Sequence, residues 1–254
     1  MSTQARQKSQ EMRRAREAEA QRRKKRQRLF TAIGIVVIVA LVAAIIFLIA
    51  KAASGGGDTG SSSGAVVAPK NLNSDGGFYV GKADAPVTVT LYYDYMCPAC
   101  GAFEKANTDE LDKLLADNTI RMDLRPIAFL DKASQGTQYS TRAANDFATV
   151  IDLAPDKAWA FHEALYANQP EENSTGLTDD KLAEIARSAG VPDSVVVKFT
   201  DKTFEPWVAK TTQKAFDSGV TGTPTIKING KPFQGNPYET GPLTEAIQAA
   251  AAQK

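Results

Sequence analysis

The chain contains 254 residues, with 30 basic and 29 acidic side chains, so its formal charge is only +1. This length suffices for one sizeable domain with additional segments. With a single histidine and two cysteines, the chain lacks the usual ligand set of a four-coordinate zinc site, and we expect no metal. The near-neutral total conceals two opposed parts, because residues 1–28 carry a net charge of +8 and the rest carries −7.

An uninterrupted apolar run without charges occupies residues 29–50. As a helix rising about 1.5 Å per residue it would span roughly 33 Å, enough to cross a bilayer. The basic block precedes it and only Lys51 follows directly, which predicts a cytoplasmic N-terminus and an extracytoplasmic C-terminal part. A cleavable signal peptide is the alternative, but the run exceeds the ~7–15 residues of a signal's apolar region, which favours an uncleaved single-pass anchor. Topology thus explains the basic block, and we expect no nucleic acid binding.

Four segments follow from this pattern. Residues 1–28 are predicted to form a basic cytoplasmic segment, residues 29–50 a transmembrane helix, and residues 51–76 a flexible linker. The linker contains a stretch of Gly, Ser, Thr and Asp from residue 54 to 64, which has no apolar side chain and cannot form a core. The remaining residues, 77–254, form the predicted folded domain.

The first half of this domain alternates between strand and helix patterns. Residues 78–80 predict a short strand, and the β-branched run at residues 86–93 predicts a second. A helical pattern fills the stretch between Cys97 and Asp117, and residues 119–130 predict another strand. A strand–helix–strand unit of this length implies parallel pairing with a right-handed crossover.

The second half begins with a long helical region. From residue 134 to 218 the pattern predicts five helices, the third with Thr178 as its N-cap. This is more helix than a simple crossover needs, so we interpret residues 131–210, approximately, as a helical subdomain inserted between the halves of the sheet. A strand, a hairpin turn, a return strand and a final helix close the chain, at residues 225–228, 229–230, 232–234 and 241–252. The predicted fold is an α/β sheet with helices on both faces.

The two cysteines lie in the motif Cys97-Pro98-Ala99-Cys100, at the junction between the second strand and the first helix. Backbone N–H groups and the helix dipole stabilise an anion at a helix N-terminus, so the Cys97 thiol should ionise at a lower pH than free cysteine. Two intervening residues let Cys100 reach Cys97, so the pair can close and open a disulfide. The alternatives are a fixed structural disulfide, which would stabilise little across so short a loop, and half a zinc site. The context favours a redox role.

The region from about residue 78 to 252 resembles the DsbA-like thiol:disulfide oxidoreductases, which have a thioredoxin fold with a helical insertion. The resemblance rests on the order and spacing of APVTV at residues 85–89, YMCPAC at 95–100 and GVTGTPT at 219–225, with Asn-Gly following at 229–230. It implies a cis bond between Thr223 and Pro224 that faces the cysteines. The exposed backbone of Thr223 would then pair with an extended substrate strand.

The sequence departs from this family's pattern at two positions. Relatives often carry a buried acid six residues before the first cysteine, where it moves a proton to or from the second thiol, and here that position is Leu91. Asp94 is the nearest carboxylate, but strand alternation places it opposite Leu91, and we interpret it as an acid that caps backbone groups. Ala99 replaces the histidine of the most oxidising relatives, so we expect a milder oxidant. His162, the single histidine, is interpreted as a surface or core residue.

Together with the predicted anchor at residues 29–50, the resemblance implies a membrane-tethered, extracytoplasmic enzyme that forms disulfides in exported cysteine-containing proteins. Cys97 and Cys100 would be its catalytic residues, and their disulfide would serve in place of a cofactor. It also implies reoxidation by a quinone-linked membrane partner. No dimerisation domain is recognisable, so we expect a monomer. Two alternatives stay open, namely a reductase or isomerase of the same fold and a non-enzymatic tethered binding or chaperone module.

Overall fold

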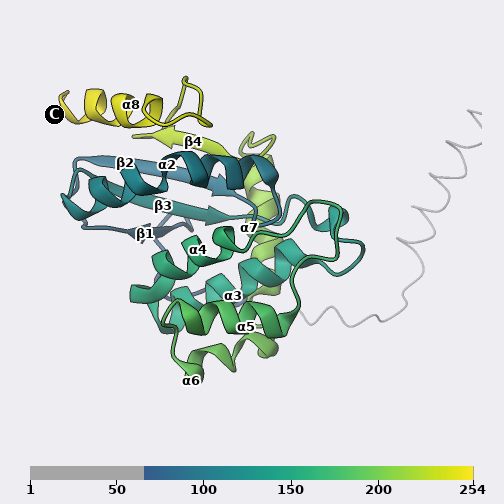
Figure 1. Cartoon of the computed structure of the whole chain (residues 1–254). Coiled ribbons are helices and arrows are strands. Elements are labelled where there is room, and N and C mark those ends of the chain that lie inside the picture. Colours follow the sequence, from purple (N-terminus) through teal and green to yellow (C-terminus); the bar gives the residue numbers. More distant parts are fainter. Residues whose placement is uncertain (1–65, 254) are drawn as a thin grey trace, which may run out of the picture. The chain divides into compact units, whose positions relative to one another are not determined.

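The computed structural model describes residues 66–253 (Figure 1). The predicted basic segment, the predicted transmembrane helix at residues 29–50 and most of the predicted linker lie outside this range. Over residues 66–253 we find no helix with both the length and the apolar character needed to cross a bilayer.

A five-stranded mixed sheet with the order β1-β3-β2-β4-β5 forms the centre of the domain. Its middle strands, β2 (Val87–Tyr93) and β3 (Ile120–Pro126), pair in parallel, as the strand–helix–strand pattern predicts. The flanking strands β1 (Phe78–Val80) and β4 (Thr225–Ile228) pair antiparallel to β3 and β2, and β5 (Lys231–Pro232) pairs antiparallel to β4. Strand β2 is β-branched and aromatic and almost entirely buried, as expected for a central strand covered on both faces.

Helices cover both faces of this sheet. Helix α2 (Pro98–Ala116) crosses one face in Figure 1, and α7 (Glu205–Asp217) lies behind it. The C-terminal helix α8 (Pro242–Ala251) packs beside β2 and β4. The inserted helices gather as a group next to the sheet and comprise α3 (Tyr139–Leu153), α4 (Ala158–Ala167), α5 (Asp179–Ser188) and α6 (Asp193–Val196). Short 3-10 turns lie before α3, between α3 and α4, and between α6 and α7, at Asp131–Ala133, Pro155–Lys157 and Phe199–Asp201. The predicted α/β architecture with a helical insertion is confirmed.

Two strand predictions are wrong at their ends. Strand β3 stops at Pro126 rather than at residue 130. Beyond it, the N–H of Ala128 donates to the Thr212 hydroxyl and the N–H of Leu130 donates to the Asp94 carboxylate. Side-chain oxygens thus accept these bonds in place of the carbonyl groups of a neighbouring strand. The return strand β5 covers Lys231–Pro232 rather than 232–234, although the N–H of Phe233 still donates to the carbonyl of Ile226.

The hydrophobic core runs without interruption from the sheet into the insertion. Buried side chains of β2, β3 and α2 form one cluster with those of α3, α4 and α5. Its largest fully buried members include three tyrosines and three phenylalanines, namely Tyr93, Tyr95, Tyr139, Phe103, Phe147 and Phe161. Each aromatic residue removes a large apolar area from water. The insertion is therefore packed against the sheet, which fixes its helices relative to the segment that carries the cysteines.

Candidate active site

The cysteine pair lies where the sequence predicts, at the start of helix α2. Cys97 is the N-cap in an extended conformation, Pro98 is the first helical residue, and the N–H of Gly101 donates to the Cys97 carbonyl at 3.1 Å. Proline suits this position because its missing N–H would have no partner in the first turn. Both cysteines are free thiols, with Cys97 6% and Cys100 1% exposed. Cys97 is the more accessible of the two, but it is less open than a freely exposed nucleophile.

The pKa values of the two thiols are shifted in opposite directions. The pKa of Cys97 is lowered to about 6, mainly because the Cys100 thiol donates a hydrogen bond to its thiolate and because the N–H groups of Cys100 and Ala99 face it. The pKa of Cys100 is raised well above its ordinary value, first by burial and then by its interaction with Cys97. Cys97 is therefore largely a thiolate at neutral pH, while Cys100 keeps its proton.

A second segment, far along the chain, completes the site. The Thr223–Pro224 bond is cis, as the family resemblance implies. The Cys97 sulfur lies 3.3 Å from the carbonyl oxygen of Thr223, to which the protonated thiol donates, although the two residues are 126 positions apart. Antiparallel pairing of β4 with β2 brings this turn to the cysteines. The backbone of Thr223 thus lies beside the sulfur at which exchange would occur.

Asp94 lies in the turn before the cysteines and is fully buried. Its carboxylate accepts hydrogen bonds from the N–H of Met96 and the N–H of Leu130, each at 2.8 Å, so the interpretation as a cap of backbone groups is confirmed. It also accepts a bond of 2.7 Å from the Ser140 hydroxyl on helix α3. Burial raises its pKa to about 6 despite these bonds.

The sequence does not predict a buried polar pair that lies beneath the site. Glu104 of α2 and His162 of α4 face each other with 3.0 Å between Oε1 and Nε2, and His162 is completely buried. The other ring nitrogen, Nδ1, lies 3.2 Å from the Tyr95 hydroxyl, which in turn lies 3.3 Å from that of Tyr93. His162 is thus a core residue, one of the two placements that we expected.

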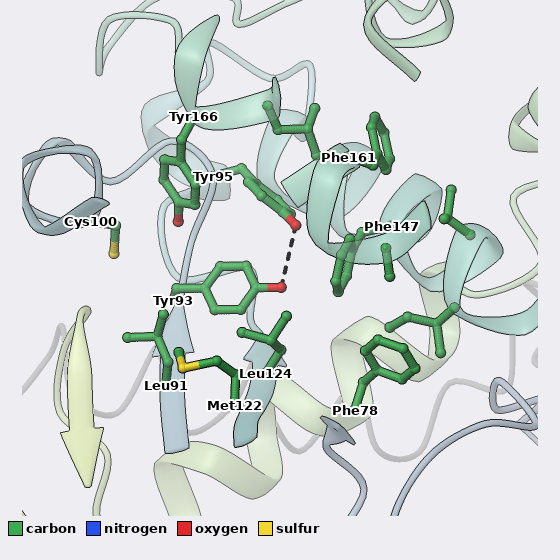
Figure 2. Close-up of a cluster of buried hydrophobic side chains, with 14 of the residues drawn as sticks. Phe78, Leu91, Tyr93, Tyr95, Cys100, Met122, Leu124, Phe147, Phe161 and Tyr166 are labelled. Atoms are coloured by element: carbon green, nitrogen blue, oxygen red, sulfur yellow. Dashed lines mark hydrogen bonds between the residues drawn. The ribbon is translucent and has the colours of Figure 1, made fainter. Parts of the chain in front are cut away.

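Figure 2 shows the buried aromatic residues on one side of the second cysteine. Tyr166 stands between Cys100 and Tyr95 in this view, while Tyr93 and Tyr95 meet through their hydroxyl groups. The Tyr166 hydroxyl donates to the backbone carbonyl of Asp94 at 3.1 Å. One signal could have found part of this arrangement, because Glu104 follows Cys100 by four residues and so shares its face of the helix. No comparable spacing points to His162.

Alkylation of the reduced protein should follow the ionisation of Cys97. Because the thiolate is the reactive form and its pKa is about 6, the rate should rise about tenfold between pH 5 and pH 7 and then level off. Iodoacetamide labelling followed by peptide mass spectrometry measures each cysteine separately. Faster labelling of Cys100 than of Cys97, or a rate that still climbs tenfold above pH 8, would contradict the acidities assigned here.

Comparison with known proteins agrees with this geometry. A family model described as "Thioredoxin" matches residues 73–249. Disulfide bond formation protein D of Bacillus subtilis is 32% identical over 154 residues, which cover 60% of this chain and 67% of that protein. The structure of the MdbA protein of Actinomyces oris, a thiol-disulfide oxidoreductase, superimposes with a TM-score of 0.61 at 27% identity, over 76% of this chain and 94% of that one.

A further relative is matched over only a small part of its own length. The serine/threonine-protein kinase PknE of Mycobacterium tuberculosis is 32% identical over 124 residues, or 47% of this chain. The match spans only 22% of the kinase. The family model, in contrast, covers more than half of the present chain and includes both cysteines and the Thr223–Pro224 turn. The chain therefore belongs to the thioredoxin family, among its DsbA-like thiol:disulfide oxidoreductases.

Proposed function

We propose that this protein is a membrane-tethered, extracytoplasmic enzyme that forms disulfides in exported cysteine-containing proteins. One observation carries the proposal: Cys97 has a pKa of about 6 and lies beside the Thr223 carbonyl, while Cys100 is buried with a raised pKa. A thiol of low pKa is a good leaving group in disulfide exchange. The site therefore favours release of Cys97 from a substrate, which is the oxidative direction.

The reaction starts from the oxidised Cys97–Cys100 pair. A substrate thiolate attacks the Cys97 sulfur, the bond to Cys100 breaks, and Cys100 leaves with the electron pair and takes up a proton. A second thiolate of the substrate then attacks the substrate sulfur of the mixed disulfide and expels Cys97 as its stable thiolate. The substrate loses two electrons to form its disulfide, and the cysteine pair gains them.

Backbone contacts would hold the substrate during these steps. The Thr223 carbonyl lies at the Cys97 sulfur, so a substrate strand that pairs with Thr223 and passes Pro224 would bring its own sulfur to Cys97. Pro98 and Ala99 form the first turn of α2, and the N–H of Ala99 stabilises the thiolate there. After turnover a quinone-linked membrane partner would reoxidise the pair, and the enzyme would act as a monomer without any other cofactor.

The activity can be tested with the oxidised full-length protein and a reduced, unfolded polypeptide that holds two cysteines. We expect substrate disulfides to form in step with thiols on the enzyme, and a variant with both cysteines replaced by serine to form none. An equilibrium with glutathione that strongly favours the oxidised enzyme would instead support the reductase alternative. Retained biological activity of the double variant would support the binding or chaperone alternative.

The topology is tested independently in intact cells. If residues 29–50 form an uncleaved anchor with the basic segment in the cytoplasm, protease added to spheroplasts should degrade the cysteine-bearing domain and leave a short N-terminal fragment. Sequencing of the mature N-terminus provides the control for cleavage. Complete protection of the domain, or a mature chain that starts near residue 53, would contradict an uncleaved anchor.

A further inference from the structure

Asp94 joins three separate parts of the fold through one carboxylate. Its Oδ1 accepts the Met96 N–H of the cysteine turn and the Ser140 hydroxyl of helix α3, at 2.8 and 2.7 Å. Its Oδ2 accepts the N–H of Leu130, in the segment after strand β3, at 2.8 Å. Its side chain is 0% exposed, so water does not compete for these bonds. The carboxylate therefore links the cysteine turn to the segment that follows strand β3 on one side and to helix α3 of the insertion on the other.

The backbone of Asp94 contacts the same turn. Its carbonyl accepts the N–H of Cys97 at 3.0 Å and the hydroxyl of Tyr166, from helix α4, at 3.1 Å. A hydrogen bond from its backbone also acts on Cys100, where it favours the charged form and so works against the raised pKa. Asp94 is thus in contact with the immediate surroundings of both sulfurs.

The carboxylate has no cationic partner among residues 66–253, since none of the ion pairs found there includes it. The groups that face it are neutral donors and other acids. Helix α3 contributes Tyr139 and Ser140, and the start of α2 contributes Cys97. The Asp94 pKa is raised to about 6, first by burial and in smaller part by the negative charge of Cys97. Repulsion between two charges is mutual, so an ionised Asp94 must also oppose the thiolate of Cys97.

We propose that Asp94 is a positioning residue that limits the oxidising strength of the cysteine pair, because its carboxylate anchors the turn while its negative charge destabilises the neighbouring Cys97 thiolate. The inference rests on the proposed function and deepens it. Reduction of the disulfide adds two electrons, leaves Cys97 as a thiolate and puts one proton on Cys100. Because the new thiolate repels the Asp94 carboxylate, Asp94 keeps its proton up to a higher pH in the reduced form than in the oxidised form, while at pH 7 it is mostly ionised and opposes the thiolate.

The first test is the exchange equilibrium of the full-length protein with glutathione at pH 7. Asp94→Asn removes the charge, so the Cys97 pKa should fall by about one unit and the equilibrium should shift about tenfold toward the reduced enzyme. Ser140→Ala is the matched control, because it removes one hydrogen bond from the same carboxylate but leaves its charge. It should lower stability without shifting the equilibrium in that direction. A purely structural Asp94 would lower stability in both variants and leave the equilibrium and the Cys97 pKa unchanged.

The second test uses the wild-type protein, so it does not depend on whether a variant folds. Carboxyl carbons of aspartate labelled with ¹³C in the wild-type protein report protonation directly, and the Asp94 signal should titrate at a higher pH in the reduced than in the oxidised protein. Equal titration midpoints in the two redox forms would overturn the inference. If wild type does not exchange with glutathione at all, the proposed function itself fails. If wild type exchanges and Asp94→Asn matches it, only the role of Asp94 is refuted.

Discussion

Replacing Cys100 with serine should turn the protein into a trap for its substrates. The N–H groups of residues 99 and 100 still favour the Cys97 thiolate, and the serine hydroxyl can donate in place of the Cys100 thiol, so Cys97 should still form mixed disulfides with reactive cysteines. Without Cys100, no neighbouring thiol can attack the bond from within the site. A well-positioned internal group is often equivalent to an effective concentration of 10⁵ M or more, so resolution should slow by roughly a thousandfold or more. Non-reducing gels of cell extracts, followed by mass spectrometry of the slow-migrating species, measure the trapped complexes.

Cys97→Ser provides the matched comparison for this experiment. The remaining thiol, Cys100, is 1% exposed and has a raised pKa, so it is both shielded and protonated at neutral pH. This variant should trap few partners or none, and it should also abolish exchange with glutathione. Comparable trapping by the two variants, or preferential trapping by Cys97→Ser, would reverse the roles assigned to the two cysteines.

The local architecture of the site follows from short stretches of sequence. The β-branched run that precedes Cys97 predicts a buried strand, and Pro98 marks the first turn of the helix behind it, so the placement of Cys97 at a helix N-terminus needs no tertiary information. Thr178 likewise caps helix α5 by accepting the N–H of Lys181. The position of the Thr223–Pro224 turn is different, because only the family resemblance points to it.

The supporting groups around the site could not be found in this way. Glu104 and His162 are 58 positions apart, and nothing in either helix pattern indicates that the two side chains meet. The apolar residues around Leu130 predict a longer strand β3, yet the N–H of Leu130 donates to the carboxylate of Asp94, 36 positions earlier. Hydrophobic periodicity and residue propensity each describe one helix or strand at a time, whereas these contacts depend on how the insertion packs against the sheet.

The pair of Glu104 and His162 should contribute strongly to stability. The His162 ring is 0% exposed, stacks on Trp159 with 5.2 Å between ring centroids, and packs edge-to-face with Tyr93 with 4.7 Å between centroids. His162→Ala would leave a cavity and would deprive Glu104 of its buried partner, so the free energy of unfolding should fall by about 3–5 kcal/mol. The chain's two tryptophans, Trp159 and Trp207, allow urea unfolding to be followed by fluorescence.

Two further experiments distinguish the contribution of the Glu104–His162 interaction to stability from that of the surrounding packing. Lys181→Ala breaks an exposed ion pair with Glu184 and should cost about 0–1 kcal/mol, which sets the scale for a surface contact. Combining Glu104→Leu with His162→Phe removes both polar groups and fills the space with apolar atoms. The double variant should therefore be more stable, by about 1–3 kcal/mol, than the sum of the losses from Glu104→Leu alone and His162→Phe alone predicts. Strict additivity would mean that the two side chains do not support each other. The large loss from His162→Ala would then come from packing among the aromatic rings alone.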